Sequence, residues 1–184
     1  PSRSRVFVEK GMPIHVTYSA AAWKNVDGLL EGAGPDNWAL ADHGLAEGDF
    51  HIRARLSVHG LKHSAARFSF DCQHSFGFEG NHGRIYITNH LAPPNRTSLA
   101  HITPAEAGIV DGKEFLFEVV RAGNRITFSV DGKEVYAANV SQYVFDCFGF
   151  EARRATIRLR SFSVEGNLSP EPFDPKLAVR WHHP

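Results

Sequence analysis

Residues 49–58 read DFHIRARLSV, and apolar and polar side chains alternate along these ten positions. An apolar residue at every second position is typical of a strand that buries one face, because successive side chains point to opposite sides of a sheet. The alternation therefore predicts a half-buried strand with Phe50, Ile52, Ala54 and Leu56 turned toward a core. The residues between them, two arginines and a histidine among them, are expected to face outward.

The same pattern recurs through most of the chain. It is found in the segments 66–72, 84–88, 115–120, 125–130, 133–136 and 156–160. Turn compositions such as 121–124 and Asp131-Gly132 separate neighbouring segments. Helix signals are confined to 19–23 and to 104–108, where Thr103 precedes a proline as an N-cap does. An α/β fold needs helices of about ten residues between its strands, so the sequence predicts an all-β, two-sheet antiparallel jelly-roll sandwich.

Length and charge balance limit the function classes. The 184 residues, 42% of them hydrophobic, suit one domain. We expect the sandwich over residues 1–166 and a proline-rich linker or tail over residues 167–184. Twenty basic and twenty acidic residues give zero net charge, which argues against a nucleic-acid partner. No apolar run reaches the roughly 18 residues of a membrane span. The chain begins at Pro1 without a leader, as expected of a mature, trimmed product.

The tetrapeptide FGFE occurs twice, at 76–79 and at 148–151. An Asp-Cys pair precedes each copy, so both cysteines, Cys72 and Cys147, belong to this repeated pattern. A glycine between two aromatic residues predicts a strand with inward rings at a place of close approach. An internal duplication is the alternative explanation.

Three stretches, 27–52, 115–135 and 148–164, resemble the concanavalin A-like (laminin-G-like) jelly-roll superfamily, in its bacterial carbohydrate-binding or glycoside hydrolase branch. The first contains a Gly-Asp-Phe strand entry, the second a hairpin that ends in VDGKEV, and the third an FGFE strand followed by an alternating one. The resemblance implies a jelly roll, a glycan ligand, and a secreted or periplasmic location in a bacterium. It leads us to expect a carbohydrate-binding module that is accessory to a catalytic domain in the same full-length chain.

Catalysis is less strongly indicated than binding. Retaining glucanases of this superfamily carry a Glu-x-Asp-x-x-Glu run, and the sequence has none. Their mechanism needs two carboxyls roughly 5 Å apart, whereas the weak candidates Glu79 and Asp49 each stand alone. Two alternatives stay open: a glycoside hydrolase of the related 3-keto-disaccharide group, and a non-catalytic structural or protein-interaction domain.

Arginine supplies 14 of the 20 basic residues, and its guanidinium suits bidentate recognition of carboxylate or sulfate. The candidate ligand-binding residues lie at outward strand positions or in turns: Arg53, Arg55, Arg67, Arg84, Tyr86, His51, Trp38 and His82. If they line one groove, the ligand is expected to be an acidic sugar. The alternative is an outer face of Arg–Glu pairs with Glu118 and Glu151, each worth less than about 1 kcal/mol.

Metal binding is a secondary expectation. Jelly-roll lectins often hold a structural calcium through carboxylates, and the candidate donors are Asp27, Asp36, Asp49 and Asp71. Zinc is not expected, because His74, His82 and His90 follow no zinc-binding spacing.

Overall fold

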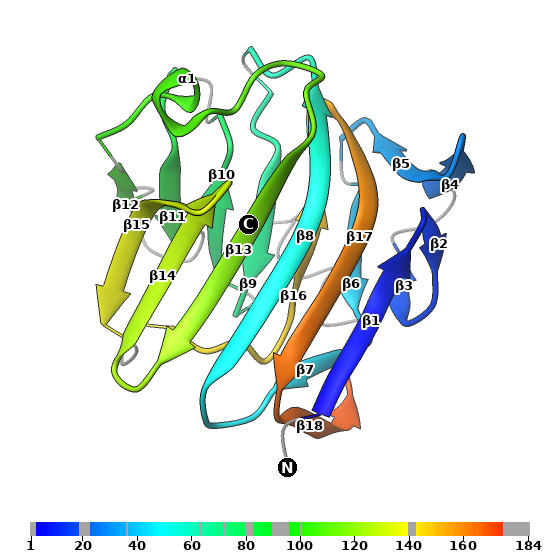
Figure 1. Cartoon of the computed structure of the whole chain (residues 1–184), viewed down its shortest axis with the longest axis vertical. Coiled ribbons are helices and arrows are strands. Elements are labelled where there is room, and N and C mark those ends of the chain that lie inside the picture. Colours follow the sequence, from blue (N-terminus) through cyan, green and yellow to red (C-terminus); the bar gives the residue numbers. More distant parts are fainter. Residues whose placement is uncertain are drawn as a thin grey trace.

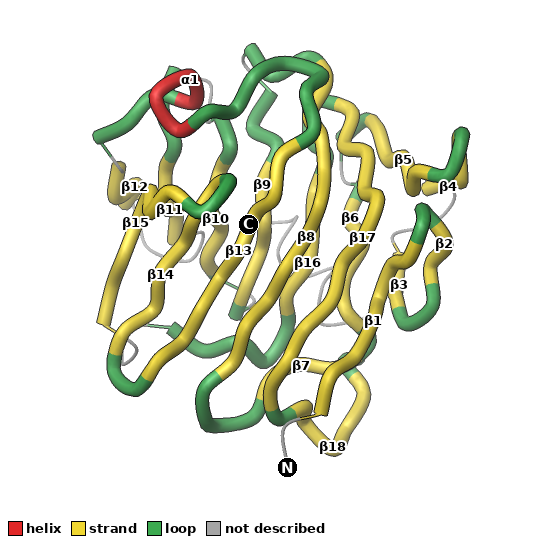
Figure 2. Tube along the Cα trace, viewed as in Figure 1, coloured by secondary structure: helices red, strands yellow, loops and turns green. Residues whose placement is uncertain are grey.

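The computed structural model of the protein describes residues 3–18, 23–35, 37–62, 64–71, 73–79, 83–89, 96–99, 101–139 and 143–174. Within these residues two large antiparallel sheets pack face to face (Figures 1 and 2). The predicted all-β jelly-roll sandwich is confirmed. In this part of the chain no helix is long and apolar enough to cross a membrane.

The sheet at the front of Figure 1 has nine strands among the described residues. Its main path runs β15 (Lys133–Asn139), β14 (Arg125–Val130), β13 (Phe115–Ala122), β8 (Phe50–His59), β17 (Thr156–Gly166), β1 (Arg3–Glu9) and β2 (Met12–Pro13). β5 (Leu29–Ala33) also pairs with β17, and β4 (Trp23–Val26) pairs with β5. Residues 50–58 of the predicted stretch thus belong to β8, which lies at the centre of the sheet between β13 and β17.

The sheet behind has seven strands among the described residues. Their order is β12 (Arg96–Leu99), β11 (Tyr86–Asn89), β10 (His74–Gly77), β9 (Arg67–Phe70), β16 (Phe148–Glu151), β6 (Trp38–Ala41) and β3 (Val16–Tyr18). A two-stranded ribbon of β7 (His43–Leu45) and β18 (Leu168–Pro172) lies at one end of the sandwich. The boundary after residue 166 stays a prediction, but the first part of the expected tail is paired with the domain.

Phenylalanines fill the layer between the sheets. Phe76 of one sheet stacks on Phe128 of the other with ring centroids 5.2 Å apart, and Phe68 meets Phe117 at 5.3 Å. All four rings are fully buried. A buried aromatic side chain of this size contributes on the order of 2–3 kcal/mol through removal of apolar surface from water. The period-2 pattern is therefore explained by a core that receives every second side chain of each strand.

Local signals outside the strands also agree with the structure where it is described. α1 (Pro104–Ala107) begins at the predicted N-cap, and the Thr103 side chain accepts the Glu106 N–H while the Glu106 carboxylate accepts the Thr103 N–H. This is a capping box. The other helix candidate, 19–23, falls mostly outside the described residues, and its last residue, Trp23, belongs to β4.

Candidate functional site

The predicted binding residues are divided between two faces of the molecule. His51, Arg53 and Arg55 lie on β8 in the nine-stranded sheet, whereas Arg67 and Tyr86 lie on β9 and β11 in the other sheet. Because outward positions of the two sheets point away from each other, these side chains cannot line one groove. The expectation of a single arginine-rich groove is wrong, and each face is considered separately.

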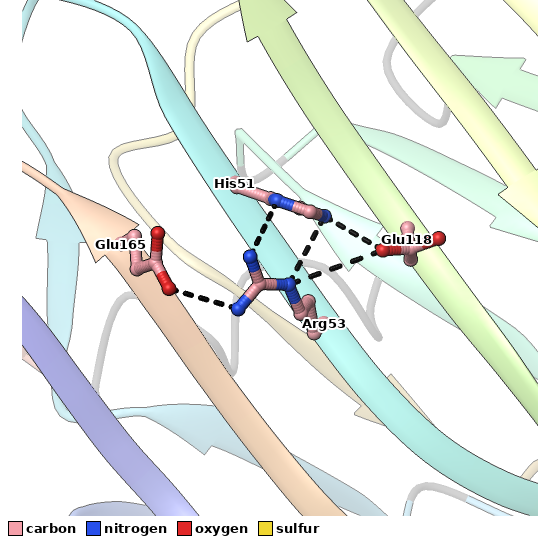
Figure 3. Close-up of polar contacts among 4 residues, drawn as sticks. All are labelled: His51, Arg53, Glu118 and Glu165. Atoms are coloured by element: carbon pink, nitrogen blue, oxygen red, sulfur yellow. Dashed lines mark hydrogen bonds and ion pairs between the residues drawn. The ribbon is translucent and has the colours of Figure 1, made fainter. Parts of the chain in front are cut away.

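On the nine-stranded sheet, Arg53 lies between carboxylates of both neighbouring strands (Figure 3). One of its terminal nitrogens donates to Glu165 Oε1 at 2.8 Å, and its Nε lies 3.9 Å from Glu118 Oε1. The Nε2 atom of His51 lies 2.8 Å from the same Glu118 oxygen. The side chains of Arg53 and Glu165 are 41% and 53% exposed, so water screens this network.

Three further arginines on the outer side of this sheet are paired in the same way. Arg158 Nε donates to Glu31 at 2.7 Å, Arg160 Nε donates to Glu114 at 2.6 Å, and Arg55 lies 3.9 Å from Glu114. The alternative of an outer face of Arg–Glu pairs is therefore confirmed here, including its predicted partner Glu118. This face is polar but has no surplus of positive charge among the pairs described.

The outer face of the seven-stranded sheet carries a different arrangement. Strand register aligns five residues in one cross-strand row, in the order Trp38, Glu151, Arg67, Gly77 and Tyr86. The residues beside them in sequence, such as Phe68, Phe76 and Phe150, point inward and are fully buried. The row thus belongs to the outer face, where sequence alternation places it.

A buried ion pair occupies the middle of this row. The Nε and a terminal nitrogen of Arg67 both lie 2.6 Å from Glu151 Oε2, and Arg153 reaches Glu151 Oε1 at 3.3 Å. The side chains of Arg67 and Glu151 are only 7% and 1% exposed. Breaking such a pair is costly because it leaves a charge in a poorly solvated place. The predicted pairing of Glu151 with an arginine is confirmed, the partner is Arg67, and the contact fixes both groups in position.

Tyr86 is the last of these five residues and lies across Gly77. A Cβ atom at position 77 would overlap the Tyr86 ring, so the close approach requires glycine there. Burial raises the pKa of the Tyr86 hydroxyl, and the Arg67 guanidinium acts in the opposite direction. The hydroxyl therefore stays protonated at neutral pH and can both donate and accept a hydrogen bond.

A second row runs beside the first and supplies hydroxyl groups. Register aligns Gly149 with Ser69, Ser69 with Ser75, and Ser75 with Thr88. All three hydroxyl-bearing residues are buried. The outer face of this sheet thus combines three hydroxyl groups, a fixed ion pair and an aromatic ring within four adjacent strands, β11, β10, β9 and β16.

Trp38 lies at the apolar end of this face. It packs with Leu40 and Cys147, and Phe173, which follows β18, packs against the three. Trp38 is 6% exposed, so the expectation of an aromatic residue at an exposed rim is wrong. Residues after β18 therefore cover part of the outer face.

The two weak catalytic candidates do not form a pair. Glu79 is buried, and its two carboxylate oxygens accept the backbone N–H groups of Ser64 at 3.2 Å and Gly83 at 2.7 Å. Asp49 is exposed and accepts the Gly123 N–H at 2.9 Å. Glu79 follows β10 and Asp49 precedes β8, at opposite ends of the sandwich in Figure 1. Both carboxylates tie loops together, and neither faces a second carboxylate at glycosidase spacing.

The remaining candidates lie apart from one another. Arg84 is exposed beside β11, and His82 lies outside the described residues. Of the calcium candidates, Asp27 is in the β4–β5 turn, Asp71 follows β9, and Asp36 lies outside the described residues, as do His90 and Cys72. Among the described residues no group of three or more histidine, cysteine or acidic side chains is placed to hold a metal ion. The structural calcium stays a prediction.

One polar cluster was not predicted. Asp71, with a left-handed backbone φ of 51°, holds His74 Nδ1 at 2.7 Å, and the Tyr143 ring packs edge-on against the His74 ring at 4.9 Å. Desolvation and the charge of Asp71 raise the pKa of Asp146. The Asp-x-x-His spacing was the available signal, but residues 143–146 reach this cluster only through contacts with residues 69 or more positions away, such as that of Tyr143 with His74.

Comparison with known proteins supports the fold. No protein-family model matches the sequence, and no curated protein does. One similar solved structure comes from work on endo-acting O-glycanases of the human gut microbiota, with a TM-score of 0.56 and 13% identity over 89% of this chain and 91% of that one. A second is Caenorhabditis elegans galectin LEC-6, with a TM-score of 0.54 and 13% identity over 73% of this chain and 94% of that one. A third is the polysaccharide lyase family 7 alginate lyase A1-II′, with a TM-score of 0.55 and 11% identity over 82% of this chain and 86% of that one. At these identities the likeness shows a shared jelly-roll sandwich.

Proposed function

We propose that the protein binds carbohydrate on the outer face of the seven-stranded sheet. The observation that carries the proposal is the row of Glu151, Arg67 and Tyr86 beside the hydroxyls of Ser69 and Thr88. Sugar hydroxyls are recognised by planar, fixed hydrogen-bonding groups, and aromatic rings pack on the apolar faces of sugars. The ion pair holds its members in one geometry, so little side-chain entropy is lost on binding.

The similar structures are consistent with this function. A galectin, an alginate lyase and work on O-glycanases all concern proteins that act on or bind glycans, and all share the sandwich. Membership of the concanavalin A-like superfamily is part of the proposal and rests on the resemblance of three sequence stretches. The residues, and not the fold, carry the argument, because one fold serves many functions.

For a glycan to bind, it must first reach the side chains of this row. Its charged and aromatic side chains are each less than a tenth exposed. Phe173 packs on the neighbouring Trp38, Leu40 and Cys147. A glycan must therefore displace residues that cover this face, and Phe173→Ala is expected to strengthen binding.

A preference for acidic sugars is supported at the edge of this face. Arg84 shares the outward alternation of Tyr86 and is exposed, and among the described residues its side chain makes no ion pair. Arg153 is 38% exposed beside Glu151. A glycan carboxylate or sulfate at this edge would meet the Arg84 guanidinium, which pairs with no carboxylate among the described residues.

We infer a non-catalytic role, as a secreted bacterial module accessory to a glycan-degrading enzyme. The alternative, a glycoside hydrolase that uses Glu79 or Asp49, is weakened by the loop contacts of both carboxylates. A hydrolysis assay on the bound glycans separates the two: release of reducing ends by the purified chain would support the enzyme.

Binding to an array of neutral and acidic glycans tests the proposal. The double variant Ser69→Ala/Thr88→Val removes two hydroxyls with little change in shape, and we expect about thirtyfold weaker binding at roughly 1 kcal/mol for each lost hydrogen bond. The matched control Thr127→Val/Ser129→Ala makes the same changes on β14, on the outer face of the other sheet. Equal loss in both variants, or no binding by the natural chain, would contradict the proposal.

The charge preference has its own pair of variants. Arg84→Gln is expected to weaken binding of acidic glycans and to leave neutral ones unchanged. Arg53→Gln, which alters an arginine of the opposite face, is expected to change neither. An unchanged acidic-to-neutral ratio in Arg84→Gln would remove the acidic-sugar preference and leave the binding face intact.

A further inference from the structure

One arginine occupies a position where the strand pattern places a core residue. On β13 the inward side chains are Phe115, Phe117 and Val119, and the next position of that series is Arg121. Its register partners, Phe50 on β8 and Ile126 on β14, are both buried inward residues. The alternation therefore directs the Arg121 side chain between the sheets, at the end of the sandwich where β13 turns into β14 (Figure 1).

A cavity of about 410 Å³ opens beside this side chain. Its apolar wall comes from Leu45, Phe50, Ile126 and Phe145, and Tyr143 lies in the wall as well. A smaller cavity of about 260 Å³ adjoins it, and Arg121 and Phe50 border both. The larger volume lies within the range of small-molecule sites, which are mostly apolar with a few polar groups that orient the ligand.

Arg121 differs from the other arginines of its sheet whose side chains are described, because it lacks a carboxylate partner. Its Nε is buried without a hydrogen-bond partner, and among the described residues no ion pair includes it. Glu47 lines the cavity, but its carboxylate is not within ion-pair distance of Arg121. A buried cationic N–H without an acceptor is unfavourable, and a bound anion removes that cost.

The neighbouring tyrosine does not supply the missing charge. The Tyr143 hydroxyl lies 3.0 Å from the Tyr136 hydroxyl. Burial and this hydrogen bond raise the pKa of Tyr143 far above its ordinary range, so the phenol stays neutral. The cavity thus offers one guanidinium over a floor of aromatic and aliphatic side chains.

We propose that this cavity is a second binding site, which takes a carboxylate attached to a six-membered ring. The guanidinium of Arg121 holds the carboxylate through charge-assisted hydrogen bonds, and the ring packs against Phe50, Ile126 and Phe145. Both uronic acids and aromatic acids present this chemistry. The site lies between the sheets and shares no residue with the row on the outer face of the seven-stranded sheet, so it stands or fails independently of the proposed function.

Titration of the full chain with glucuronate and with benzoate, followed through backbone amide shifts in NMR spectra, tests the proposal. We expect saturable shifts at Arg121, Val144 and Phe145, and at least tenfold weaker binding of the uncharged counterparts, glucose and benzamide. Stronger binding of glucuronate identifies the ligand as a sugar acid, and stronger binding of benzoate identifies it as an aromatic acid; either result supports the carboxylate site.

Substitutions separate the site from a general charge effect. Arg121→Gln is expected to abolish binding of the preferred acid, whereas Arg125→Gln, four residues along the same hairpin and exposed, leaves it unchanged. Arg121→Met provides a second variant if the first is unstable, and we expect it to raise the melting temperature because it removes a guanidinium whose buried Nε has no hydrogen-bond partner. Absence of saturable shifts with both acids, or equal binding by Arg121→Gln and the natural chain, would overturn the proposal.

Discussion

Two arginine–glutamate pairs show how burial changes the contribution of an ion pair to folding stability. Arg67 and Glu151 are almost fully buried, whereas Arg53 and Glu165 are about half exposed, and both pairs join neighbouring strands. Exposed pairs contribute about 0–1 kcal/mol because water solvates the separated charges nearly as well. Removing one member of a buried pair costs about 3–5 kcal/mol, because the remaining charge stays poorly solvated.

We therefore expect Arg67→Ala to lower the free energy of unfolding by about 3 kcal/mol, at the lower end of that range because Arg153 still faces Glu151. Arg53→Ala is expected to cost less than about 1 kcal/mol. Urea denaturation of both variants measures the difference. The double variant Arg67→Met/Glu151→Leu should recover most of the loss, and equal costs for the two single variants would refute the contrast.

At the scale of the strands, the two FGFE segments perform the same structural task. Gly77 in β10 and Gly149 in β16 face outward, and the flanking phenylalanines fill the core. A Cβ at Gly77 would overlap the side chain of Tyr86, whereas a Cβ at Gly149 would overlap the backbone of β6 at Ala39 and Leu40. A side chain can rotate away, but a paired strand cannot.

This difference predicts that a glycine-to-alanine substitution lowers the free energy of unfolding by unequal amounts at the two positions. Gly149→Ala should lower stability by about 3 kcal/mol, at the upper end of the overpacking range, and Gly77→Ala by about 1 kcal/mol. Thermal unfolding of the two variants measures the order. Gly77→Ala should also weaken glycan binding, because it moves Tyr86 away from Arg67. The reverse order of stabilities would show that the sheet shifts more easily than the Tyr86 ring.

The strands with clear alternation were predictable, because alternation is a local property, whereas β1, β12 and β18 lie in no predicted strand segment. DFHIRARLSV identified β8 and the side chains that it buries, and Thr103 identified the start of α1. Which strands meet was not predictable, because pairing is decided by contacts far apart in sequence. Arg67 and Glu151 are 84 positions apart, and only their register on adjacent strands brings them into contact.

The candidate site was predicted only in part, because alternation shows which side chains face outward but not which strands are neighbours. Arg67 and Tyr86 were identified as outward residues, but their separation from Arg53 followed only from the assignment of β8 and β9 to different sheets. The Arg121 cavity gave no local signal, since an arginine at the end of an alternating strand is ordinary. Its lack of a partner depends on loops from three parts of the chain.

For the whole molecule, the central claim is that one of two similar polar faces binds glycan. NMR chemical-shift mapping of the full chain with the strongest glycan binder from the array tests it directly. The account predicts shifts concentrated at Ser69, Ser75 and Thr88 on the seven-stranded sheet, with Thr127 and Ser129 on the other sheet unchanged. Shifts centred on Thr127, Ser129 and Arg53, or none on either face, would contradict it.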